Sequence, residues 1–302
     1  MAMVLHQASR KKANLRIGLA GPSGSGKTYS ALLLAYGLCG DWSKIALIDT
    51  ENGSGDLYSN LGEYQVLTLQ EPFDPRRYIE AIKTCENAGA EVIIIDSITH
   101  EWNGPGGCLE MHDKATKAMR NPNSYMAWNQ ITPLHDQFIQ SIIQSRCHII
   151  TTVRSKTEYI LVDYNGRQRP QKAGMGQVTR DGFEYELTVS FDLNQDHTVI
   201  VSKDRTEMFS EYNGESISIK TGEMLLEWAN SGADDKIDKD TVYKIEAEIE
   251  RTDTKLGDIL EHYNVTSLKQ LNTQQAQNCL ALLNKKTTMN KIEQLPNGEI
   301  AH

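Results

Sequence analysis

The sequence lacks the features of membrane, secreted and disulfide-stabilised proteins. Its 302 residues contain no apolar run that approaches the roughly 20 residues needed to cross a bilayer. The first residues, MAMVLHQASRKK, have no long apolar core of the kind found in a secretion signal. The five cysteines are scattered, with no CxxC pair, which argues against a disulfide framework or a zinc site. We therefore expect a cytoplasmic protein without a membrane partner.

The charge balance is acidic, with a formal net charge of −9. An acidic total argues against indiscriminate coating of nucleic acid, but it leaves room for a local basic site. Hydrophobic residues make up 39% of the chain and charged residues 24%, as in globular proteins. The length allows one large domain and a smaller one.

Short apolar runs of strand length alternate with longer amphipathic stretches over residues 14–230. The strand-like runs include LRIGLA, KIALIDT, EVIIIDS and CHIITTV, whereas PRRYIEAIKTCENAG has apolar residues three to four apart, as in a helix. This alternation predicts an α/β fold with a mainly parallel sheet between helices. Two later runs, EYELTVSFDL and HTVIVSKD, predict strands that extend the sheet antiparallel.

Apolar content falls and charge rises around NSGADDKIDKD, which we interpret as a linker over 231–240. The chain beyond it predicts a small helical module over 241–286, with polar breaks at TDT and NVTS. Asn272, followed three residues later by Gln275, has the pattern of a helix cap. Residues 1–13 are then an N-terminal arm, and residues 287–302 are a flexible tail.

The octapeptide GPSGSGKT, residues 21–28, has the spacing G-x-x-x-x-G-K-[ST] of a phosphate-binding loop. Gly21 and Gly26 let the backbone turn its N–H groups toward phosphates. Lys27 can reach the β- and γ-phosphates, and the Thr28 hydroxyl can bind Mg²⁺. We therefore expect ATP and Mg²⁺ as cofactors. The remaining loop residues, expected at the same phosphates, are Pro22, Ser23, Gly24 and Ser25.

Two carboxylates follow apolar runs and are expected at the same edge of the sheet. Asp96 closes VIIID and can join the Mg²⁺ shell, because parallel sheets bind ligands at the carboxyl ends of their strands. Glu51 lies just beyond the run that ends at Asp49 and can orient water onto the γ-phosphate. The alternatives are a turn aspartate and a solvated loop glutamate. A further metal site is not expected, since ITHEW is not HExxH and His100 and His112 lack ligand spacing.

In this order, GPSGSGKT, ALIDTENGSGDLY and VIIIDS resemble the core of RecA-type recombinases. The resemblance implies that Glu51 is the catalytic carboxylate and that Tyr58 stacks on adenine. The family's nearby aspartate matches less well, because Asp56 is displaced by one position. At HIITTVRSK the sensor glutamine of RecA is missing, and residues 152–154 stand in its place.

The resemblance continues at VIVSKDRTEMF. It implies that Lys203 and Arg205 reach the γ-phosphate of a neighbouring subunit and stabilise charge in the transition state. The chain would then assemble head to tail as a homo-oligomer, either a filament or a ring. The alternative is two exposed cations at the end of a strand.

Residues 154–180 carry six basic residues against two acidic ones, a local net charge of +4. Glycines and Pro170 predict a loop, and Tyr159 and Tyr164 are available for base stacking. Cations with aromatic residues between them suit single-stranded DNA, whereas a solvated loop or a loop over the nucleotide is the alternative. The basic residues are Arg154, Lys156, Arg167, Arg169, Lys172 and Arg180. The tryptophans, including Trp102 and Trp128, are expected in the core or at its rim.

Residues 14–230 most resemble the short RecA-like ATPases of bacteriophages, which include single-strand annealing proteins. Residues 241–286 resemble a helical module of phage recombination proteins. The resemblance implies a DNA-stimulated ATPase that promotes annealing or strand exchange in the bacterial host cell, with a phage recombination or single-strand-binding protein as a candidate partner. The alternative is an ATPase switch or helicase loader that remodels a protein. A small-molecule kinase is a third possibility, but no lid or acceptor site is found.

Overall fold

A computed structural model describes residues 13–164, 167–212, 214–231, 237, 239–271 and 273–293. The contacts divide the chain after Ser231 into a larger and a smaller unit, each of which is described by itself. None of the helices described is both long enough and apolar enough to span a bilayer.

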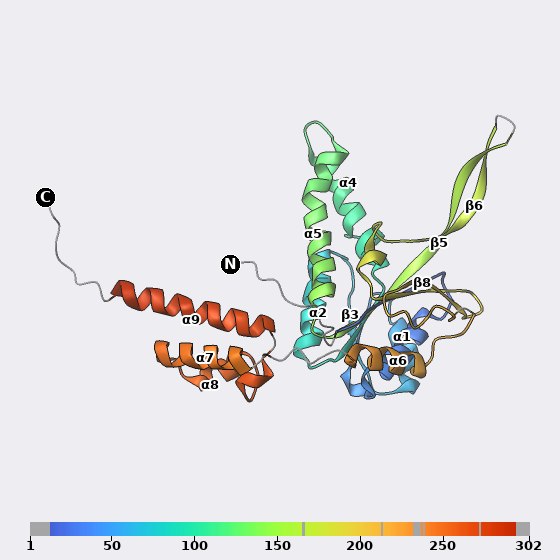
Figure 1. The fold of residues 1–302 in the computed structure, drawn as a ribbon. Coiled ribbons are helices and arrows are strands. Elements are labelled where there is room, and N and C mark those ends of the chain that lie inside the picture. The colour runs from blue at the N-terminus through green and yellow to red at the C-terminus, as the bar shows by residue number, and fades with distance from the viewer. Residues whose placement is uncertain are drawn as a thin grey trace. The chain divides into compact units, whose positions relative to one another are not determined.

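The larger unit is built on an eight-stranded, mostly parallel sheet in the order β3-β2-β4-β5-β1-β7-β8, with β6 paired to β5 (Figure 1). Strands β7 and β8 pair antiparallel. The predicted α/β fold with a mainly parallel sheet is confirmed. The strands are β1 (Arg16–Gly21), β2 (Ile45–Asp49), β3 (Gln65–Thr68), β4 (Val92–Asp96), β5 (His148–Tyr164), β6 (Arg167–Gln177), β7 (Val189–Leu193) and β8 (Val199–Asp204).

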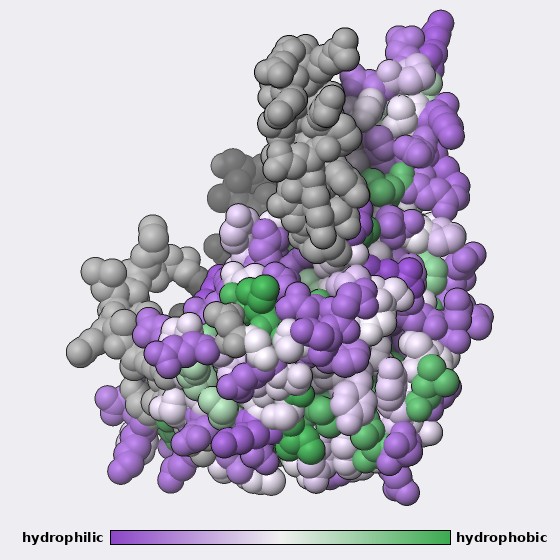
Figure 2. All heavy atoms as spheres, turned by 90° about the vertical axis from the view of Figure 1, so that its right-hand side faces the viewer, coloured by the Kyte–Doolittle hydropathy of each residue, from purple (hydrophilic) through white to green (hydrophobic). Residues whose placement is uncertain are grey.

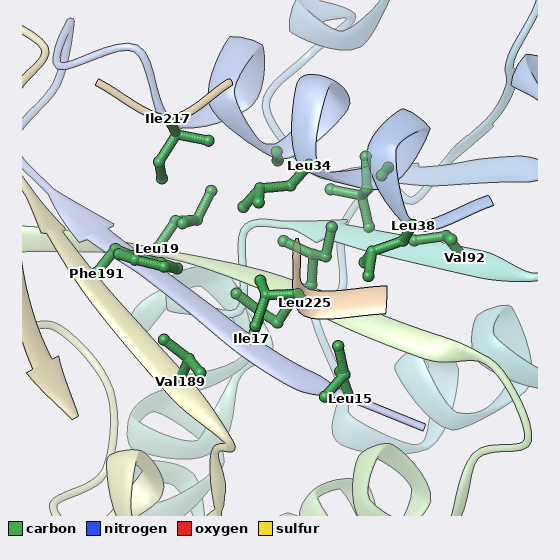
Figure 3. Packing of buried hydrophobic residues seen from close by; sticks show 14 of the residues in the cluster. Leu15, Ile17, Leu19, Leu34, Leu38, Val92, Val189, Phe191, Ile217 and Leu225 are labelled. Atoms are coloured by element: carbon green, nitrogen blue, oxygen red, sulfur yellow. The ribbon is translucent and has the colours of Figure 1, made fainter. Parts of the chain in front are cut away.

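The central strands are buried on both faces, because helices cover each side of the sheet. Every residue of β1, β2 and β4 is buried. Along β4, Ile94 packs into one core while Ile93 and Ile95 pack into the other, as the two-residue period of a strand requires. The first core lies under α1 (Lys27–Cys39) and α6 (Ile219–Asn230), and Figure 3 shows Ile17, Leu34 and Leu225 converging there.

The second core lies under α2 (Pro75–Asn87) and α5 (Ser124–Gln144), which contribute Tyr78 and Phe138. Two short helices, α3 (Thr99–Asn103) and α4 (Cys108–Ala118), connect β4 to α5. Asn123 caps α5 by accepting a hydrogen bond from the backbone of Met126. On the face that Figure 2 shows, the described residues are mostly hydrophilic.

Most of the predicted loop at 154–180 is instead a pair of antiparallel strands, the outer part of β5 up to Tyr164 and β6 from Arg167 to Gln177, here called the hairpin. Strand β5 pairs in parallel with β1 as far as Arg154, and beyond it pairs antiparallel with β6 from Ser155 to Tyr164. The outer parts of the two strands run out from the sheet (Figure 1). The glycines and Pro170 misled the prediction, because an edge strand tolerates proline and the run TEYILVDY favours β structure.

The predicted strand EYELTVSFDL begins later than its apolar pattern indicated. Phe183–Glu186 form a 3-10 turn, and β7 starts only at Val189. Phe183 and Leu187 are buried in the second core, so the apolar pattern arises from a packed turn.

The smaller unit is a helical module. It contains α7 (Lys239–Thr252), α8 (Leu256–His262), a 3-10 turn over Leu268–Gln270 and α9 (Thr273–Glu293). Its core includes Ile245, Leu271 and Cys279. Helix α9 runs on to Glu293, so residues 287–293 of the predicted flexible tail are helical. The proposed cap residue Asn272 lies outside the described residues.

Candidate active site

The segment 21–28 connects the end of β1 directly to the first turn of α1. Gly24 and Gly26 have φ angles of 79° and 86°, which a residue with a side chain rarely adopts. A Cβ atom at Gly21 would lie 2.8 Å from the carbonyl oxygen of Leu193, so a side chain there would displace β7. The loop is therefore a tight turn that ends at the N-terminus of a helix. The free backbone N–H groups at such a terminus favour the binding of phosphates.

The side chain of Lys27 folds back onto the first residues of this loop. Its ammonium group donates hydrogen bonds to the carbonyl oxygens of Gly21, at 3.0 Å, and Pro22, at 2.8 Å. Burial lowers the pKa of Lys27, and the negative charges of Asp96 and Glu51 oppose that effect. The ammonium is thus presented close to two carboxylates.

Asp96 and Thr28 are in direct contact, although 68 residues separate them. The Thr28 hydroxyl donates to Oδ2 of Asp96 at 2.6 Å, and the Thr152 hydroxyl donates to Oδ1 at 2.5 Å. Burial raises the pKa of Asp96, and the two hydroxyl donors partly offset this rise. A carboxylate next to a hydroxyl forms a set of hard oxygen ligands, which fits Mg²⁺.

Glu51 is tied to a residue far along the chain. Its Oε1 accepts a hydrogen bond at 3.0 Å from Nε of Arg154 and another at 3.0 Å from the Ser97 hydroxyl, while its Oε2 pairs with Nη2 of Arg154. Burial raises the pKa of Glu51, but the hydrogen bond and charge of Arg154 outweigh it, so the net pKa is lowered. Asp49 holds the turn, because its Oδ1 accepts a hydrogen bond from the Glu51 N–H at 2.6 Å.

These groups line one pocket of about 190 Å³. Tyr58 reaches it from the 3-10 turn Ser54–Leu61, and its ring centroid lies 5.8 Å from that of Tyr29 on α1. The pocket is lined by Ser23, Gly24, Gly26, Lys27, Thr28, Glu51, Ser54, Tyr58, Asp96 and Arg154.

The comparison with family models agrees with this geometry, since the model of the AAA domain matches residues 13–225. The chain belongs to this family of P-loop ATPases. No curated protein matches the chain. The matched region contains the loop at 21–28, the whole sheet and α6 as far as Leu225.

Within the AAA domain, the structure adds two contacts that the sequence does not predict. Arg154, expected both at the position of the sensor glutamine and among the DNA-binding residues, lines the loop pocket and pairs with Glu51. His197, in the turn between β7 and β8, has Nδ1 at 3.1 Å from the carbonyl oxygen of Ser25. No local signal marks the contact of Arg154 with Glu51 or that of His197 with Ser25, because both depend on the pairing of distant strands with β1.

Lys203 and Arg205 contact their own chain. Lys203 Nζ donates to the carbonyl oxygen of Glu184 at 2.8 Å and to that of Tyr185, and Arg205 Nη2 donates to Tyr185 at 2.6 Å. Burial lowers the pKa of Lys203, and the charge of Arg205 adds to this effect. Neither side chain lines the nucleotide pocket of the same AAA domain.

The remaining basic residues lie on or next to the hairpin. Lys156 is exposed, and Arg180 forms an ion pair with Asp136 at 3.1 Å. The side chains of Arg167, Arg169 and Lys172 lie outside the described part of the AAA domain. Backbone register pairs Tyr164 with Arg167 and Tyr159 with Lys172, which makes aromatic and basic residues cross-strand neighbours.

A buried cluster of three polar side chains lies near α3. Glu101 accepts hydrogen bonds from the Cys108 thiol at 3.0 Å and contacts His135 Nδ1 at 3.0 Å. The three ligand atoms lie within 4.8 Å of one another, a geometry that could also hold a transition-metal ion. The sequence does not indicate this cluster, because its three members lie on three different helices.

Proposed function

We propose that this AAA domain hydrolyses ATP while acting on single-stranded DNA, in the annealing or strand-exchange reactions of phage recombination. One observation carries the proposal. Strand β5 contributes Thr152 and Arg154 to the nucleotide site and then continues, without a break in the strand, into the basic hairpin. A change of nucleotide at one end of β5 therefore acts on the strand that carries the basic residues.

The hydrolytic roles follow from the contacts in the pocket. The loop N–H groups and Lys27 would hold the phosphates, and Thr28 and Asp96 would hold Mg²⁺, which supplies charge neutralisation. Glu51 would orient the attacking water. A γ-phosphate carries more charge than a carboxylate, so it would compete with Glu51 for the Arg154 guanidinium. Moving Arg154 would release Glu51 to accept a hydrogen bond from water.

Two further parts of the proposal concern assembly. We expect Lys203 and Arg205 to leave the carbonyl oxygens of residues 184 and 185 when subunits assemble into a filament or ring. Both side chains would then contact the nucleotide of the neighbouring subunit. We place the reaction in the cytoplasm of the bacterial host, with a phage recombination or single-strand-binding protein as a further partner.

The test is ATP hydrolysis with and without single-stranded DNA, at low and moderate salt. We expect salt-sensitive stimulation by DNA, because cations on the hairpin replace counterions along the phosphate backbone. Neutralising Arg167, Arg169 and Lys172 together should abolish the stimulation and leave DNA-independent hydrolysis. Lys27→Ala should lose nucleotide binding altogether. Hydrolysis indifferent to DNA, without DNA binding in the presence of an ATP analogue, would rule the proposal out.

A second candidate is an ATPase switch or helicase loader that remodels a protein partner. It is favoured by a mostly apolar pocket of about 370 Å³ in the helical module, where Leu282 is 50% exposed and Tyr263 lies between α8 and α9. Under this alternative, hydrolysis responds to a protein partner, and Leu282→Asp removes that response without changing stimulation by DNA.

A further inference from the structure

A second pocket, of about 430 Å³, lies in the larger unit at the base of the hairpin. One wall is formed by Trp102, Asn103 and Leu109, from α3 and the start of α4. A second group of lining residues consists of Thr179 and Arg180, just beyond the end of β6, together with Lys156 on β5. The volume is in the range of sites for small organic ligands. Among the described residues, none lines both this pocket and the nucleotide pocket.

Trp102 is a rigid aromatic wall. Its ring stacks on that of Trp128 at 5.6 Å, with 14° between the planes, and Trp128 stacks in turn on His112 at 4.3 Å. The ring of His135 meets Trp102 edge-on at 5.6 Å. An indole fixed in this way loses little conformational entropy when it packs against another flat ring.

The second group of lining residues includes a polar group that needs a partner. Thr179 is 8% exposed, and its hydroxyl has no hydrogen-bond partner among the described residues. A buried hydroxyl without a partner is unfavourable, so a ligand that offers a donor or an acceptor is stabilised here.

Two cationic side chains at this site can contact a phosphate. Lys156 is exposed, and Arg180 keeps its guanidinium near the surface through its ion pair with Asp136. Asp181 is the one carboxylate among the described lining residues. Two cations beside an aromatic ring suit a base and its phosphate, because every base has a face that can stack.

The backbone of Arg154 joins this pocket to the nucleotide site. Its N–H donates to the Thr99 hydroxyl at 2.9 Å, at the start of the helix that carries Trp102. Its carbonyl oxygen accepts from the N–H of Val178 at 2.8 Å, next to Thr179. Both walls are thus hydrogen-bonded to the residue whose side chain holds Glu51.

We propose that this pocket binds one nucleotide of single-stranded DNA, with the base against Trp102, the phosphate between Lys156 and Arg180, and a polar group of the nucleotide at the Thr179 hydroxyl. The inference rests on the proposed function, since it specifies where the strand enters. It also gives a route between the two sites, because a shift of Arg154 would move both pocket walls.

The experiment measures binding of a labelled oligothymidylate to the full-length protein by fluorescence anisotropy, with an ATP analogue present. Trp102→Leu should weaken binding about ten- to one-hundred-fold, and Trp102→Phe should restore most of the affinity. Thr179→Val keeps the shape of the side chain and should weaken binding several-fold. Lys156→Gln should lower the slope of log affinity against log salt by about one.

Trp42→Phe is the matched control. Trp42 stacks on Tyr36 beside the core under α1 and α6, so the variant should leave binding and hydrolysis unchanged. If the wild type binds DNA but Trp102→Leu and Thr179→Val, both folded by circular dichroism, bind equally well, the pocket is not the site and the proposed function stands. If the wild type does not bind DNA, both proposals fail.

Discussion

Asp96 shows how the environment of one residue sets up the site. Burial raises the pKa of its carboxyl group, so a bare charge there is unfavourable, and two threonine hydroxyls donate to it. A buried carboxylate of this kind gains most from a cation placed against it. Glu51 differs, because Arg154 already supplies that charge.

Arg154 provides a test at the same scale. Arg154→Gln removes the hydrogen bond and the charge of Arg154 that lower the pKa of Glu51, so that pKa should rise in the variant. In the wild type without nucleotide, the low pKa keeps Glu51 ionised as pH falls. The acid limb of the kcat/KM profile, which reports the free enzyme, should therefore move to higher pH in the variant. We also expect kcat to fall about 100-fold through loss of a cation at the γ-phosphate. Hydrolysis measured from pH 4 to 9 checks both.

Exposed Arg120 supplies the control, because Arg120→Gln changes the same charge away from the pocket and should leave the profile unchanged. An acid limb in Arg154→Gln identical to that of the wild type would show that Arg154 does not set the charge of Glu51.

Three helices depend on one buried polar contact. Glu101 on α3 is fully buried and contacts both Cys108 on α4 and His135 on α5. Glu101 and His135 also support the stacked rings of Trp102 and Trp128. Glu101 precedes Trp102 in the chain, and the ring of His135 packs edge-on against the ring of Trp102. Packing of α4 and α5 alone would not specify this arrangement, since α4 buries little apolar surface.

Removing one partner should therefore be costly. Glu101→Ala should lower the free energy of unfolding by about 3 kcal/mol, because it leaves His135 and Cys108 buried without their acceptor. Lys114→Ala breaks the exposed ion pair between Lys114 and Glu110, both on α4. This control should lower the free energy of unfolding by less than about 0.5 kcal/mol. Urea denaturation of both variants measures the difference; equal losses would mean that the buried cluster adds no stability.

At the scale of the whole molecule, the proposed assembly requires each nucleotide site to be shared. Lys27→Ala lacks the phosphate-binding lysine, and Lys203→Ala lacks the cation that would reach across the boundary. A mixture of equal amounts of the two inactive variants should regain on the order of a quarter of wild-type hydrolysis. In random head-to-tail assembly, about one boundary in four joins a subunit with intact Lys27 to a neighbour with intact Lys203. Mixing followed by a steady-state ATPase assay checks this. A mixture as inactive as its components would show that Lys203 does not act on the nucleotide of a neighbouring subunit.

Local sequence patterns were enough to predict part of the fold and the position of the site. The spacing of GPSGSGKT and the apolar runs before Asp49 and Asp96 predicted the loop, the parallel strands and the edge where the site lies, because turn geometry and strand burial depend on neighbouring residues. The same reasoning failed at 154–180, where glycine and proline suggested a loop, since partner-strand hydrogen bonding decides between a loop and an edge strand.

The sequence by itself determined that a phosphate-binding loop precedes a helix, that two carboxylates follow buried strands, and that a basic stretch lies downstream. The tertiary structure alone decided which of these groups meet. Arg154 pairs with Glu51 across 103 residues because β5 lies between β1 and β4. Thr179 and Trp102 line the same pocket, although 77 residues separate them in the sequence. Such contacts depend on the order of strands in the sheet, which arises from packing over the whole domain.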